Sequence, residues 1–162
     1  MRSALFAAAF CALLSVSPTL ADGTAATPVV AELVGGNGKA VKLDAGARSS
    51  LAVIEQDVSF QSAKGQESGR YRGVLLWDLF KAEGMLDEAG HHGELRQVFS
   101  VTGADGYRID FSVGEIAPEF GNRRIMLATE ADGKPLGLPR VVVPGDKRGA
   151  RSVRDVVRIE VR

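Results

Sequence analysis

Cysteine and histidine are almost absent from this sequence, and their scarcity excludes several kinds of chemistry. The 162 residues contain one cysteine, Cys11, and two histidines, His91 and His92. One thiol cannot form an internal disulfide, and it cannot supply the thiolate set of a structural zinc site. The two histidines are neighbours within the acidic, glycine-containing segment 87–94, which is typical of a solvated loop. We therefore predict no metal site.

An excess of charge of either sign is also missing. Twenty basic residues balance twenty acidic ones, and the calculated pI is about 6.7. A general nucleic-acid binder carries a large basic excess, so we expect no nucleic-acid partner. The distribution along the chain is uneven, however: residues 140–162 hold seven basic and three acidic side chains. This basic segment suits either a site for phosphate or another anion, or a solvated face balanced by the acidic remainder.

The chain lacks a hydrophobic run long enough to cross a bilayer. Its longest run covers the thirteen residues 4–16, follows Arg2 and is ended by Pro18. This length suits a signal peptide, and the small residues around Ala21 fit a cleavage site. We predict a signal peptide at 1–21, a flexible lead-in at 22–28 and one domain at 29–162. The mature protein is then periplasmic or secreted, has no transmembrane segment and has lost Cys11.

Hydrophobic patterning predicts a single α+β domain with a mostly antiparallel or mixed β-sheet and few helices. The helix at 74–83 is the clearest, because Leu75, Leu76, Leu79 and Phe80 share one face and Gly84 can end it. A short helical turn is expected before Pro118, another within 45–51, and polar loops at 64–69 and 87–93. Strands are expected at 29–34, 39–43, 51–60, 98–101, 107–111, 124–129, 138–143 and 153–161. Glycine-rich turns should join them at 35–38, 103–106 and 132–133.

Several short motifs occur in an order that resembles the sulfite-oxidase-type oxidoreductase molybdopterin-binding domain family. The most telling lie in the basic segment, where Pro-Arg-Val-Val-Val-Pro-Gly is followed by Gly-Ala-Arg-Ser-Val-Arg and a final strand. These and the earlier matching pieces are Gly73–Leu79, Gly103–Tyr107, Met126–Ala128, Asp132–Leu136, Pro139–Gly145, Gly149–Arg154 and Val157–Val161. The resemblance implies the sulfite-oxidase-type molybdopterin-binding fold.

The resemblance also implies a set of cofactor-binding residues. In the family, the arginine of Pro-x-Arg and a Ser-Val-Lys triplet contact the anionic end of the pterin. These positions correspond to Arg140 and to Ser152, Val153 and Arg154, with arginine in place of the lysine. The neighbouring Arg151 completes the predicted set.

The sequence departs from the family at the metal ligand. The family holds molybdenum through a cysteine ahead of the helix, and here the segment 58–63 contains none. We therefore predict an exported protein whose domain lacks a competent molybdenum site and binds an anionic small molecule or a periplasmic protein. One alternative is a molybdopterin-dependent, sulfite-oxidase-like oxidoreductase with non-cysteine ligation. Another is binding of a different anion by the loop 145–154. The sequence assigns no catalytic residue.

Overall fold

Nine β-strands and a few short helices make up the part of the chain that the computed structural model describes, residues 31–44 and 48–162. The strands are β1 (Glu32–Val34), β2 (Ala40–Lys42), β3 (Ile54–Ser62), β4 (Gly65–Leu75), β5 (Val98–Gly103), β6 (Arg108–Ser112), β7 (Met126–Ala131), β8 (Lys134–Val142) and β9 (Val156–Val161). The helices are α2 (Leu76–Ala82), α3 (Val113–Ile116) and the 3₁₀ helices η1 (Gly93–Arg96) and η2 (Gly149–Arg151). The predicted signal peptide and lead-in lie outside the described residues, as do residues 45–47 of the helical turn predicted within 45–51.

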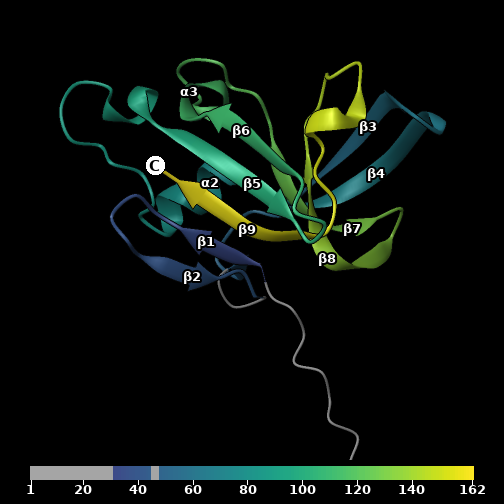
Figure 1. Ribbon diagram of the computed structural model, residues 1–162, viewed down its shortest axis with the longest axis horizontal. Helices are drawn as coiled ribbons and strands as arrows, with labels where there is room; N and C mark the ends of the chain where they lie inside the picture. The colour runs from purple at the N-terminus through teal and green to yellow at the C-terminus, as the bar shows by residue number, and fades with distance from the viewer. Residues whose placement is uncertain (1–30, 45–47) are drawn as a thin grey trace, which may run out of the picture.

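The strands form two sheets (Figure 1). One has the order β2-β1-β9-β5-β6 and is mixed, because β1 runs parallel to β9 while its other pairs are antiparallel. The second has the order β3-β4-β7-β8 and is fully antiparallel. The predicted α+β class with few helices is confirmed, and the strand arrangement is mixed, but the strands divide between two sheets instead of forming one.

The larger core lies where α2 packs against the mixed sheet. Leu76, Leu79 and Phe80 are fully buried, as the predicted apolar face requires. The rings of Phe80 and Phe99, the latter on β5, make a T-shaped contact with a centroid separation of 5.2 Å. The helix begins two residues later than predicted, because Val74 and Leu75 still pair with β7 as the end of β4.

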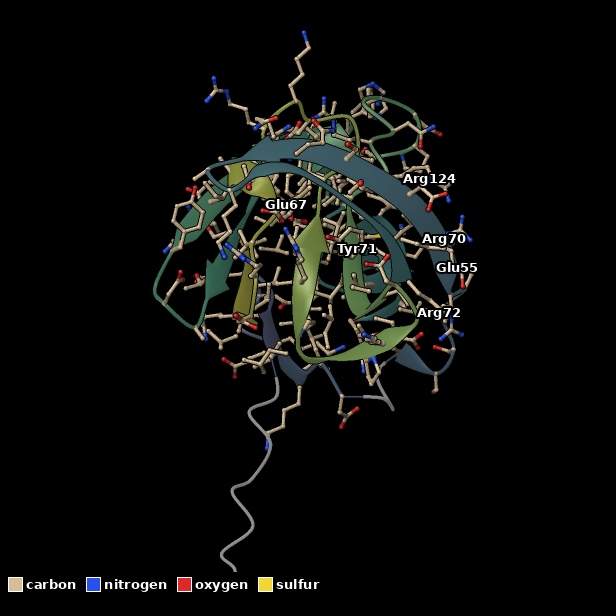
Figure 2. The ribbon with its side chains drawn as sticks, turned by 90° about the vertical axis from the view of Figure 1, so that its right-hand side faces the viewer. Glu55, Glu67, Arg70, Tyr71, Arg72 and Arg124 are labelled. Carbon is tan, nitrogen blue, oxygen red and sulfur yellow. The ribbon has the colours of Figure 1, made fainter. Side chains whose placement is uncertain are left out.

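The loop predicted at 64–69 is wrong, because this segment is the first half of β4. β3 and β4 form a long hairpin whose register runs from Ser62 opposite Gly65 to Ile54 opposite Gly73. Figure 2 shows this ribbon curving over β7 and β8. Residues 65–69 of β4 carry no large apolar side chain, so the alternation that identifies a half-buried strand is missing from this part of the sequence.

The three predicted turns are confirmed. The turn 35–38 joins β1 to β2, 103–106 joins β5 to β6, and 132–133 joins β7 to β8. Gly38, Gly106 and Gly133 all have positive φ, which glycine adopts without steric cost. The helical turn expected before Pro118 is α3. Within the described ranges, no helix has the length and apolar character needed to cross a membrane.

Candidate anion-binding pocket

A pocket of about 390 Å³ opens where the tip of the β3–β4 hairpin meets the segment 148–154. The hairpin and this segment are joined by backbone contacts: the amide of Gln61 donates to the carbonyl of Lys147 at 2.9 Å, and Gln61 forms a parallel bridge with Arg148. β8 supplies Arg140, and the hairpin supplies Phe60 and Glu67. The pocket therefore brings the tip of the hairpin together with Arg140 on β8 and the segment 148–154, which lie more than 70 residues later in the chain, and we call it the anion pocket.

Three arginines and one carboxylate give the anion pocket a positive balance. Arg140, Arg148 and Arg154 line it, opposed by Glu67. Arg148 and Arg154 are exposed and form no ion pair with any described residue. Guanidinium groups without a carboxylate partner, gathered at one cavity, are suited to a ligand with a phosphate or carboxylate group.

Arg140 forms the inner wall of the anion pocket. Its guanidinium lies over the rings of Phe60 and Tyr71, 5.3 and 5.4 Å from their centroids, and Nη1 donates to the Tyr71 hydroxyl at 3.1 Å. Both rings favour a cation at this position. The Nε atom is buried without an acceptor among the described residues. Arg140 thus retains hydrogen-bonding capacity that the described part of the chain does not use.

Gly149 allows the loop to lie directly on this wall. A Cβ atom at residue 149 would stand 2.5 Å from Cε2 of Phe60, closer than real side chains approach. The glycine in the Gly-Ala-Arg-Ser motif therefore has a local steric explanation. It brings the backbone of η2 onto the ring that supports Arg140.

Ser152 and Val153 attach the loop to β8. The buried Ser152 Oγ accepts a hydrogen bond from the amide of Val143 at 3.2 Å, and the carbonyl of Val153 accepts one from Val141 at 2.9 Å. Ser152 lines the anion pocket, whereas Val153 lines a neighbouring cavity of about 260 Å³ beside Tyr107. Both residues fix the position of Arg154.

Arg151 faces away from the anion pocket and belongs to an ion-pair cluster. Its guanidinium donates two hydrogen bonds to Asp146, at 2.8 and 2.7 Å, and a third to Glu115 at 3.1 Å. Arg123 also donates to Asp146, at 2.8 Å. Hydrogen bonds from Arg151 hold the pKa of Asp146 below its usual value, and the same bonds raise the pKa of Arg151. Of the five predicted residues, the structure brings Arg140, Ser152 and Arg154 together at one cavity and gives Arg151 a different set of partners.

Two charged residues of the pocket were missing from the predicted set. Arg148 lies inside the basic segment, so the charge count included it without distinguishing it from its neighbours. Glu67 falls in the segment predicted to be a loop, and its pairing with Phe60 in the hairpin brings it into the pocket that Arg140 and Arg154 also line. A hydrogen bond from Ser62, together with the charges of these two arginines and of a nearby lysine, holds the pKa of Glu67 below its usual value.

The donor atoms of the described residues do not fit a molybdenum ion. Residues 60–63, on the segment where the family carries its cysteine, present a phenyl ring, an amide, a hydroxyl and a methyl group to the pocket. The described ranges contain no cluster of three His, Cys, Asp or Glu side chains placed to hold a metal. The arginines suit an anionic group, and the described lining of the pocket contains no thiolate that could hold molybdenum.

Comparison with known proteins adds no further assignment. No model of a known protein family matches this sequence, and a search of curated proteins returns no match.

Proposed function

We propose that this protein is an exported binding module that holds a small phosphate-bearing molecule in the anion pocket. One observation carries the proposal: Arg140, Arg148 and Arg154 converge on one cavity, and the last two have no ion-pair partner among the described residues. A volume of about 390 Å³ also lies within the size range of small-molecule sites.

The motif resemblance supports a specific ligand class for this pocket. A phosphorylated pterin such as molybdopterin would place its anionic end against Arg140 and Arg154, the positions that match the family pattern. The proposed fold is accordingly the sulfite-oxidase-type molybdopterin-binding fold. Because the donor atoms at the pocket do not suit molybdenum, we propose binding without turnover.

The first test examines the native protein. Mature protein is purified from the periplasm of its own host, then analysed for molybdenum and for fluorescence of released, oxidised pterin. Pterin without molybdenum is the expected result. Near-stoichiometric molybdenum together with pterin would contradict the proposal and favour the alternative oxidoreductase with non-cysteine ligation.

The second test measures affinity directly. Phosphate and a pterin phosphate are titrated into ligand-free protein by isothermal titration calorimetry. Arg148→Ala and Arg154→Ala should each weaken binding by about tenfold, the scale of one lost charge-assisted hydrogen bond. Binding should also weaken as salt is raised, since both side chains are exposed.

Arg124→Ala is the matched control for these two variants. Arg124 is an exposed arginine without an ion-pair partner among the described residues. Its carbonyl accepts a hydrogen bond from Gln56, which lies toward the open end of the hairpin, whereas Glu67 lies near the tip (Figure 2). Its loss changes the total charge equally and should leave affinity unchanged. An equal loss of affinity in Arg124→Ala would show that the effect comes from the total charge of the protein and not from the pocket. Absence of binding to the unaltered protein would overturn the proposal.

A further inference from the structure

A second cavity, of about 300 Å³, lies between α2, the loop 87–96 and the turn after α3. Its lining shares no residue with the anion pocket. Trp77 and Phe120 form its aromatic walls, and Glu88, Glu94, Glu119 and Lys81 provide its charges. In Figure 1 the loop before β5 and α3 lie on the same side of the molecule, as their contacts require. We call this cavity the acidic aromatic pocket.

The two aromatic rings line the wall of the pocket, and each has one further polar or charged neighbour. Trp77 is partly buried and packs against the main hydrophobic core, and this contact positions its side chain. Phe120 is 43% exposed. The imidazole of His92 makes a T-shaped contact with its ring, at a centroid distance of 5.1 Å. The ammonium of Lys81 lies 5.9 Å from the Trp77 ring centroid, so this ring already has a cation within range.

The turn that carries Phe120 is tied to α3 by backbone hydrogen bonds. The amide of Phe120 donates to Ala117 at 3.0 Å, and the amide of Gly121 donates to Gly114 at 3.0 Å. A Cβ atom at residue 121 would stand 2.5 Å from the carbonyl oxygen of Glu115, so the turn is closed tightly onto α3. A ligand would therefore meet a preformed surface, which reduces the entropy cost of binding.

The charges of the acidic aromatic pocket are negative in balance. Lys81 is paired with Glu88, which leaves two carboxylates. Glu94 is only 18% exposed and lies 3.4 Å from Nδ1 of His92, and Glu119 forms no ion pair with a described residue. Aromatic faces and carboxylates attract the same kind of ligand, one with positive charge and an apolar surface.

We propose that the acidic aromatic pocket binds a small organic cation of the alkylammonium class. The apolar substituents of the ligand would contact Trp77 and Phe120, and its charge would face Glu94 and Glu119. The three carboxylates do not form a metal-binding cluster among the described residues, and the aromatic walls also favour an organic cation over a metal ion.

The test uses the single tryptophan of the sequence, Trp77, as a fluorescent reporter at the site. Choline is titrated into the protein and compared with its neutral isostere, in which a carbon atom replaces the quaternary nitrogen. Choline should produce a saturable change in tryptophan emission, with affinity at least about tenfold above that of the isostere, because only the cation gains the ring and carboxylate attraction. Equal affinities, or no saturable change, would overturn the proposal.

Variants locate the binding. Glu119→Gln and Phe120→Leu should each weaken choline binding severalfold, whereas Glu55→Gln, which removes one exposed carboxylate on β3, should not. Circular dichroism verifies that each variant is folded, and Glu119→Gln changes only an exposed side chain. Unchanged affinity in Glu119→Gln and Phe120→Leu would refute the assignment of the site. Since the two pockets share no lining residue, the outcome is independent of the phosphate titration.

Discussion

Asp146→Ala should destabilise the protein more than most substitutions of residues near the surface do. Asp146 is 14% exposed and accepts three hydrogen bonds from arginines, two from Arg151 and one from Arg123. Asp146 precedes η2 and Arg151 is its last residue, so their hydrogen bonds also hold the ends of the segment that contains Arg148 together. Truncation of the carboxylate leaves two guanidinium groups without their main partner.

The magnitude follows from these contacts. A hydrogen bond to a charged group contributes about 1.5–3 kcal/mol when it is well sheltered from solvent. Arg151 and Arg123 are 31% and 37% exposed, so solvent screens much of this, and Glu115 still pairs with Arg151. We expect a loss of about 2 kcal/mol in the free energy of unfolding, which lowers Tm by about 6–8 °C for a domain of this size.

The pH dependence supplies a second, independent signature. Because the folded-state pKa of Asp146 is depressed, its contribution is fully present above the unfolded-state pKa of about 3.9 and is lost as pH falls through the lower folded-state value. The stability difference between the unaltered protein and Asp146→Asn should therefore be constant above about pH 5 and shrink below about pH 4.

Urea unfolding, followed by Trp77 fluorescence and circular dichroism, measures both effects. A double-mutant cycle with Arg151→Ala isolates the pairwise energy, which should be at least about 1 kcal/mol. A coupling energy below about 0.5 kcal/mol, or a stability difference that is the same at pH 3 and pH 7, would refute the account of this cluster.

Three further substitutions have defined outcomes. Gly73→Ala should lower the free energy of unfolding in urea by about 3 kcal/mol, because the new Cβ would stand 2.7 Å from Cα of Ala128 on β7. The control Gly137→Ala has open space around its new Cβ and should leave the free energy of unfolding nearly unchanged. Equal losses in the two variants would contradict this prediction. Tyr71→Phe should cost about 1 kcal/mol in the same assay, since it removes the acceptor for Nη1 of Arg140, and a neutral result would show that this bond adds nothing. Glu67→Gln should tighten phosphate binding measured by calorimetry at low salt, because the one carboxylate lining the anion pocket loses its charge; weaker binding would place the ligand elsewhere.

Local sequence signals predicted those elements whose stability is itself local. The β5–β6 hairpin was predicted because a turn with glycine at its last position separates two apolar runs, and the structure pairs Val98 with Ser112 through that turn. The helix was predicted from its apolar face, and Leu76, Leu79 and Phe80 are buried as expected. Its first residue was misplaced because the end of β4 is decided by pairing with β7, a contact between residues far apart in sequence.

The candidate site shows the same division. The motifs and the charge count identified the loop 145–154 and Arg140, because charge and glycine content are properties of the chain itself. Arg151 and Arg148 could not be distinguished in this way, since both are arginines within four residues of each other in a basic segment. The positions of Asp146 and Glu115 place Arg151 in an ion-pair cluster, while the bridge to Gln61 leaves Arg148 at the pocket.

The α+β class, the turns, the apolar face of α2 and the basic character of residues 140–162 could thus be read from the amino-acid sequence alone. Each of these depends on neighbours along the chain, within reach of one turn of helix or one hairpin. Three other features became visible in the folded chain: the strands form two sheets, Glu67 and Arg140 line the same cavity, and Trp77, Phe120 and three glutamates surround another. These arrangements depend on packing between distant segments, and the free energy of that packing is not contained in any short stretch of sequence.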